Sequence, residues 1–195
     1  MLLPLVWLCS CASKPEQKES YKGIDPRISA PQTLEFLGET YNAGYSAYDK
    51  DKCIVEYFRA GEGQKTWKKL LSLRLNPKGM DSRQLVDKMQ ESVTAGGASA
   101  VRSFKGKTTD EYGIEFTMMS RKAVELDVFR FMNRPNGTGT ISFQYAEKIP
   151  ADELRKVGEA KLPEYYGGIR SKVVKALEEA PMPKIMLVPS IDHYK

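Results

Sequence analysis

Two strand-like segments joined by an Asn-Gly turn occupy the second half of the chain. VELDVFRFMN and GTISFQYAEK are rich in β-branched and aromatic residues, and Arg134-Pro135-Asn136-Gly137 separates them. Because Asn-Gly readily adopts the positive φ angles of a tight hairpin turn, the two segments are predicted to pair antiparallel. The apolar phase of the first segment starts on Leu126 and Val128. It moves to Phe129 and Phe131, which predicts either a β-bulge or burial of both faces.

Five further segments have the alternation of strands. YNAGYSAYDK and DKCIVEYFRA flank a reversal at residues 49–51, so they form a second candidate hairpin. TWKKLLSLRLN places three leucines on one face and ends at the turn-forming residues 76–79. ASAVRSFKGK is a short strand candidate, and EYGIEFTMMS alternates large apolar with smaller or polar residues. That alternation predicts one buried face for the last segment.

Three helices are expected. Asp81 or Ser82 caps a segment with an apolar stripe of period four, which ends at the glycines 96–97. Pro150 precedes a helix at ADELRKVGEAKL, and a longer helix over residues 164–179 carries Ile169, Val173 and Leu177 on one side. The tail MPKIMLVPSID is predicted to add an edge strand.

Hairpin-linked strands with helices before and after them predict an α+β fold, a single domain over residues 33–195 with an antiparallel β-sheet flanked by helices. The stretch EYFRAGEGQKTWKKLLSLRL resembles one found in uncharacterised bacterial secreted proteins of the Mog1/PsbP-like fold. The likeness spans Glu56 to Pro150. It implies the same antiparallel sheet with flanking helices, and it carries no known catalytic set.

The chain begins with an apolar run, residues 2–8, that is too short for the roughly 20 residues of a membrane-spanning helix. It has the length of a short signal-peptide core, although no Lys or Arg precedes it. The segment Leu8-Cys9-Ser10-Cys11 resembles the bacterial lipobox. The resemblance implies cleavage of residues 1–10 and lipidation of Cys11. The alternative is a buried N-terminal strand of a cytoplasmic protein.

The resemblance to lipoproteins also implies a location. Acyl chains on Cys11 would anchor the protein to the membrane of the bacterial cell envelope, well beyond the marginal binding of a single chain. Ala12 follows the cysteine, which implies the outer membrane, with the domain facing the periplasm. Residues 11–32 are rich in Lys, Glu, Ser and Pro, so they are predicted to be a lipidated N-terminus and flexible linker.

The remaining cysteine chemistry centres on Cys53. After lipidation it is the one free thiol, and its alternation with Val55 and Tyr57 favours a buried core residue over a reactive nucleophile. His193 is the single histidine of the chain. A catalytic Cys/His pair would therefore have one available partner, and a hydrolase using Cys53 is the weaker alternative.

Several other motifs are rejected. Gly106-Lys107-Thr108 ends like a P-loop but lacks the earlier glycine and the following helix. One histidine and one usable cysteine give no metal cluster of ordinary spacing, so no metal and no cofactor is expected. Glu125 and Asp127 lie two residues apart on one strand face, which is more typical of a solvated surface than of an acid pair.

Two windows of the sequence are basic and free of acidic residues. The net charge is only +5, from 30 basic and 25 acidic residues, which is weaker than the footprint of a nucleic-acid-binding protein. If the strands of the two windows are neighbours, they form one anion-binding face for phospholipid or another anionic envelope component. Solvated strand faces are the alternative. The candidate residues are Lys65, Lys68, Lys69, Arg74, Arg102, Lys105 and Lys107.

The function expected from the sequence is a non-catalytic binding or assembly module at the membrane surface of the cell envelope. A second candidate is a carrier that holds a small ligand or lipid in a pocket between the sheet and its helices. Nothing in the sequence identifies a protein partner.

Overall fold

The computed structural model describes residues 19–49, 52–76, 79–120, 123–135, 138–157 and 161–188. Its helices are α1 (Ser82–Ala95), α2 (Ala151–Val157) and α3 (Leu162–Glu179). Its strands are β1 (Glu19–Tyr21), β2 (Ile28–Ser29), β3 (Thr33–Phe36), β4 (Glu39–Asp49), β5 (Lys52–Phe58), β6 (Lys69–Asn76), β7 (Ser99–Lys105), β8 (Glu111–Met119), β9 (Ala123–Asn133), β10 (Thr140–Pro150) and β11 (Met186–Leu187). The predicted α+β class is confirmed.

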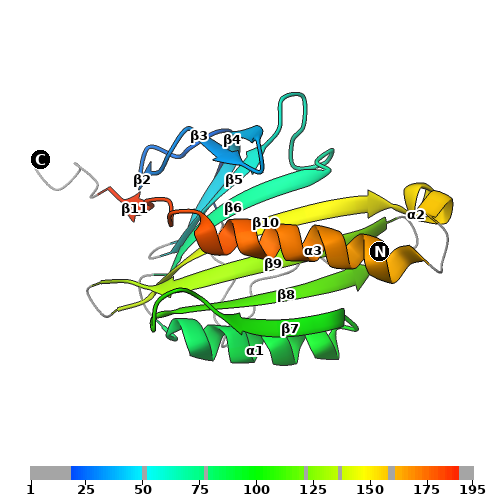
Figure 1. Ribbon diagram of the computed structural model, residues 1–195. Helices are drawn as coiled ribbons and strands as arrows, with labels where there is room; N and C mark the ends of the chain where they lie inside the picture. The colour runs from blue at the N-terminus through cyan, green and yellow to red at the C-terminus, as the bar shows by residue number, and fades with distance from the viewer. Residues whose placement is uncertain are drawn as a thin grey trace, which may run out of the picture.

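One antiparallel sheet dominates the part of the chain that the structure describes (Figure 1). Its strands follow the order β1-β4-β5-β6-β10-β9-β8-β7, and β3 pairs with the remaining part of β4. The hairpins β4–β5 and β9–β10 pair as the sequence predicts. The central contact joins β6 to β10, which are far apart in the sequence. It unites a half built from β3–β6 with a half built from β7–β10.

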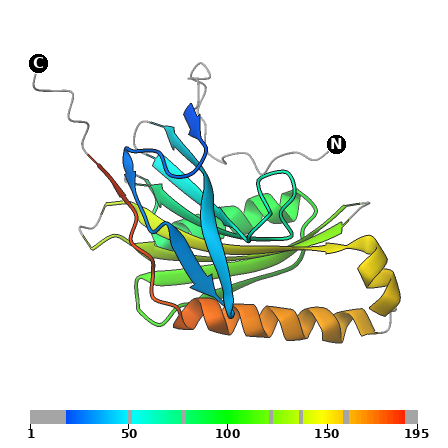
Figure 2. The ribbon, with the colours of Figure 1, turned by 90° about the horizontal axis from the view of Figure 1, so that it is seen from above.

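Helices cover the two faces of this sheet (Figure 2). On one face Val173 and Leu177 of α3 pack into the main core cluster. On the other face Val86 and Val93 of α1 pack against aromatic side chains of β8 and β9. Burial of both faces explains the phase shift of β9, because its register to β8 and β10 runs without a bulge. Leu126 and Val128 belong to the α3-side cluster, whereas Phe129 and Phe131 belong to the α1-side cluster.

The helix boundaries follow local signals. Asp81 is the N-cap of α1, and its carboxylate accepts a hydrogen bond from the backbone N–H of Gln84 at 2.8 Å. The Gln84 side chain accepts one from the Asp81 N–H, which completes a capping box. α2 follows Pro150 directly, as predicted, and α3 carries Pro163 in its first turn. Short connections thus place α2 beside the start of α3.

The predicted linker 11–32 is wrong for its second half, because part of it belongs to the fold. β1 pairs with β4, and β2 pairs with β11, so both of these N-terminal strands belong to the fold. β11 is the strand expected in the tail MPKIMLVPSID, but it lies in a separate two-stranded sheet with β2. Ile28 is 4% exposed and lies in the main core. Asp25 is buried and donates its backbone N–H to Ser46. The charged composition of this stretch hides its few core-forming residues. The predicted signal peptide, residues 1–10, and the predicted lipidation site Cys11 lie outside the described residues.

Candidate functional site

A cavity of about 850 Å³ lies between α3 and the end of the sheet formed by β7, β8 and β9. One side of α3 forms its roof along several turns, and Leu154 of α2 closes one end. Its lining comes from five elements: Ser99, Ala100 and Arg102 of β7; Glu115, Thr117 and Met119 of β8; Val124 of β9; Leu154 of α2; and Tyr166, Gly167, Arg170, Ser171, Val174, Lys175 and Glu178 of α3.

A buried ion pair forms the floor of the cavity. Arg170 donates from Nε to Glu115 Oε2 at 3.0 Å, and its Nη2 lies 2.8 Å from Oε1. The same Nη2 donates to the carbonyl oxygen of Ala100 at 2.7 Å. Such a fork-to-carboxylate pair fixes both side chains in one geometry. It ties α3 to β8 and β7, and it leaves the floor neutral.

The backbone of β7 bends at this floor. Ala100 has a φ of 53°, a left-handed value that is uncommon outside glycine, and the register between β7 and β8 shifts between Ser99 and Arg102. The hydroxyls of Ser99 and Thr117 lie 2.7 Å apart across the strands. The bulge sits where the Ala100 carbonyl accepts its hydrogen bond from Arg170.

Sequence reasoning missed this floor. β8 was predicted to have one buried face, but Glu115 and Thr117 on the supposedly polar side are each 7% exposed. The signal for Arg170 was present, since it occupies the same helix face as Val173, Val174 and Leu177 at spacings of three, four and seven. A charged residue within an apolar helix stripe predicts a buried partner. The identity of that partner depends on packing of α3 against β8, which no local pattern contains.

The two ends of the cavity differ in polarity. Met119 and Val124 are paired across β8 and β9, and together with Leu154 they make one end apolar. Toward the other end lie Arg102, which is opposite Glu115 in the β7–β8 register, and Lys175 of α3. Glu178 follows Lys175 by three residues on the same helix.

The direction of α3 along the sheet follows from its contacts. Arg170 contacts Glu115 on β8, and farther along the helix the carbonyl of Leu177 accepts a hydrogen bond from Arg130. Arg130 pairs with Gly113, so the helix runs opposite to β8. The start of α3 therefore lies toward Met119, and Lys175 lies toward the Arg102 end.

Gly167 leaves part of the cavity wall open. A Cβ atom built at Gly167 would meet no atom within 4 Å, and the same holds for its neighbour Gly168. Glycine inside a helix costs about 1 kcal/mol relative to alanine, and neither position needs the absence of a side chain for packing. Of the two, Gly167 lines the cavity.

The structure does not bring the seven predicted anion-binding residues onto one face. β10, β9 and β8 lie between β6 and β7, so the strands of the two basic windows are not neighbours. Lys65 and Lys68 are exposed on the loop before β6, and Lys105 and Lys107 are exposed at the end of β7. Arg102 is the member of the set that lines the cavity.

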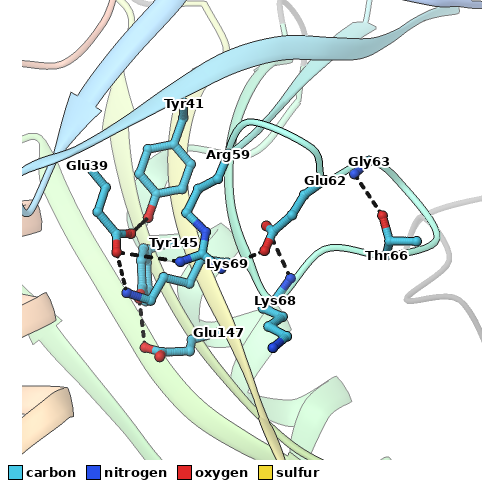
Figure 3. A network of polar contacts seen from close by, with 10 residues as sticks. All are labelled: Glu39, Tyr41, Arg59, Glu62, Gly63, Thr66, Lys68, Lys69, Tyr145 and Glu147. Atoms are coloured by element: carbon cyan, nitrogen blue, oxygen red, sulfur yellow. Dashed lines mark hydrogen bonds and ion pairs between the residues drawn. The ribbon is translucent and has the colours of Figure 1, made fainter.

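Lys69, another member of the predicted set, belongs to a polar network at the ends of β4, β5 and β6 (Figure 3). Its Nζ lies 2.9 Å from Oε1 of Glu39, and the hydroxyl of Tyr41 donates to Oε2 of the same carboxylate. Arg59 joins Glu39 to Glu62. The charge of Lys69 is thus balanced within the fold.

Arg74 points to the α1 side of the sheet, into a second polar cluster. It donates from Nη2 to Gln144 Oε1 at 2.8 Å, and Gln144 donates from Nε2 to Asp127 Oδ1 at 2.7 Å. Asp127 is 2% exposed, so its predicted place on a solvated surface is wrong. Burial, and secondly the nearby charge of Glu125, raise the pKa of Asp127 to about 8. The second buried face of β9 causes this difference.

Cys53 is a core residue, as its strand pattern favours. It is 2% exposed, and burial raises the pKa of its thiol to about 12. His193 lies outside the described residues. Within the described ranges no group of three or more His, Cys, Asp or Glu side chains is arranged to hold a metal ion. In the same ranges, no helix combines the length and the apolar character of a membrane span.

Comparison with known proteins gives one family. A family model matches residues 28–182, from β2 to just beyond α3, and so includes every residue of the cavity lining. Searches of curated proteins and of solved structures give no match. The resemblance to the Mog1/PsbP-like fold therefore stays a prediction.

Proposed function

The chain belongs to the family whose model matches residues 28–182, and we propose that its folded part is a binding module that holds a small, largely apolar ligand beneath α3. The cavity of about 850 Å³ carries the proposal. Sites for small molecules usually have about 300–1,000 Å³, with apolar walls and a few fixed polar groups. The cavity has that size and that mixture of side chains.

Two further observations support a bound molecule. The hydroxyl of Tyr166, in the cavity wall, is buried without a hydrogen-bond partner among the described residues. A buried polar atom of this kind is usually satisfied by water or a ligand. Gly167 weakens the helix, although a side chain at this position would project into free space. A molecule in the cavity could form a hydrogen bond with the Tyr166 hydroxyl and occupy the space beside Gly167.

The polar floor is suited to holding and orienting a ligand. Glu115 accepts a hydrogen bond from Arg170 Nε and forms an ion pair with its Nη2, so Arg170 already binds both oxygens of this buried carboxylate. We therefore propose a non-catalytic role. We also propose that Cys11 carries the lipid anchor and places the module at the envelope membrane, which the lipobox resemblance supports. The intact mass of the protein extracted from membranes shows whether Cys11 carries acyl chains, and it tests the anchor separately.

The binding function is tested on the full chain carrying Cys11→Ser, which prevents lipidation. The probe is N-phenyl-1-naphthylamine, an uncharged apolar dye whose fluorescence rises on leaving water. We expect saturable binding that Gly167→Leu weakens by at least about tenfold, because the leucine side chain would project into the cavity and occupy space that the dye needs. Gly168→Leu is the matched control and should change the affinity by less than about twofold.

Both substitutions should preserve the fold, since neither Cβ meets another atom within 4 Å and leucine favours helix. Circular dichroism and thermal unfolding verify this. If the dye does not bind the parent protein, or if both leucine variants bind equally well, the cavity is not a ligand site.

A further inference from the structure

The cavity has an uncompensated positive end. At its floor Arg170 and Glu115 neutralise each other through two contacts. The remaining charged groups of the lining are Arg102 and Lys175, with Glu178 as the acidic group. Two cations and one carboxylate leave an excess of one positive charge at this end.

Arg102 is free to bind a ligand. It lies opposite Glu115 in the register, but Arg170 already holds that carboxylate. The Arg102 side chain is exposed and makes no hydrogen bond or ion pair within the described part of the chain, and the same holds for the side chain of Lys175. An arginine guanidinium offers its donors in a fork that matches a carboxylate or a phosphate.

The opposite end of the cavity is suited to a hydrocarbon chain. Met119 is 75% exposed, which is unusual for a large apolar side chain and leaves much of its surface for contact. Val124 and Leu154 continue the apolar surface toward the start of α3. Covering such surface is favourable by about 25 cal/mol per Å².

We propose that the cavity binds a single-chain amphiphile with an anionic head group, a carboxylate or a phosphate. The head lies between Arg102 and Lys175, and the chain runs over Met119 and Val124 toward Leu154. This inference rests on the proposed function and assigns the ligand class and its orientation.

The test uses four amphiphiles with the same chain: dodecanoate, dodecyl phosphate, dodecanol and dodecyltrimethylammonium. Each displaces N-phenyl-1-naphthylamine from the Cys11→Ser protein below its micellar concentration. We expect the two anions to bind at least about tenfold more tightly than dodecanol and the cation. The ratio of the two anions distinguishes a carboxylate from a phosphate head.

Variants locate the head group. Arg102→Gln with Lys175→Gln should weaken both anions by at least about tenfold and change dodecanol by less than about twofold. The matched control is Lys105→Gln with Lys172→Gln, because these exposed lysines lie on the same strand and helix but outside the lining. The control removes the same net charge, and it should leave all four affinities within about twofold.

The outcomes separate the two proposals. Equal binding of all four amphiphiles, tighter binding of the cation, or equal losses in both double variants would overturn the anionic head while leaving the cavity as an apolar site. Absence of dye binding would overturn the proposed function itself.

Discussion

Asp127 should make the stability of the fold decrease as the pH rises. The residue lies on β9 with one oxygen accepting from Gln144, and its other oxygen is buried without a hydrogen-bond partner among the described residues. Burial, and secondly the charge of Glu125, raise its pKa from the ordinary 3.8 to about 8. The hydrogen bond from Gln144 and the charges of Arg74 and Lys148 act in the opposite direction without restoring the ordinary pKa.

The sign follows from proton binding. Between the two pKa values the folded state holds a proton on Asp127 that the unfolded chain releases, so its contribution to stability is complete below about pH 4 and is lost as the pH rises through about 8. These values are about 4 pH units apart. Each pKa unit corresponds to about 1.4 kcal/mol, which gives an upper value of about 6 kcal/mol.

The substitution Asp127→Asn isolates this effect. Asparagine stays neutral, and its Oδ1 can accept the same hydrogen bond from Gln144. The free energy of unfolding of the variant, relative to the parent, should increase by about 1.4 kcal/mol for each pH unit between about pH 5 and pH 7. Urea unfolding followed by circular dichroism at several pH values measures it, with the exposed Asp87→Asn as control.

A difference between Asp127→Asn and the parent that stays constant across this range would refute the reasoning. So would a parent protein that gains stability over the variant as the pH rises. Either result would mean that the carboxylate is already ionised in the fold at low pH, and that Arg74 or Lys148 compensates its charge.

Three further outcomes are expected. Gly113→Ala on β8 should destabilise the protein by about 1–3 kcal/mol in urea unfolding, because the new Cβ would overlap the ring of Phe104; adding Phe104→Ala should recover part of the loss, and an unchanged midpoint would contradict the packing. Cys53 should resist iodoacetamide in the native protein and react in urea, as mass spectrometry can show; rapid native alkylation would instead reveal an accessible thiol. Asp81→Ala should cost about 1 kcal/mol of unfolding free energy by loss of the α1 cap, and equal stability would show that Gln84 alone suffices.

Local signals predicted the elements well, because they depend on residues close in sequence. Asp81 and the glycines 96–97 bound α1, and the strands on either side of Asn136-Gly137 pair as expected. These features require only capping, turn chemistry and periodicity. The order of the strands in the sheet does not follow from such local signals. The pairing of β6 with β10 is a tertiary contact, and no local pattern specifies it.

From the sequence, the cavity could be predicted only in general terms, as a pocket between the sheet and its helices. Arg102 was singled out for its charge, but it was grouped with Lys69 and Arg74 of β6, from which three intervening strands separate it. Glu115 looked like an ordinary outward-facing residue, since strand alternation cannot show that a helix covers the second face. Arg170 gave a usable signal by interrupting an apolar helix stripe. Its partner became identifiable only once α3 was placed on the sheet.

The contact between β6 and β10 also has consequences for how the molecule is made. Ser72 and Gln144, which are hydrogen-bonded across these strands, lie 72 residues apart. Closing so long a segment costs entropy before any pairing repays it, so this step is expected to be slow compared with formation of the hairpins. β6 cannot pair with β10 before the segment between them has closed, and until then its backbone groups form an unprotected edge. Nascent chains stopped before residue 140 should accordingly recruit chaperones more than complete ones.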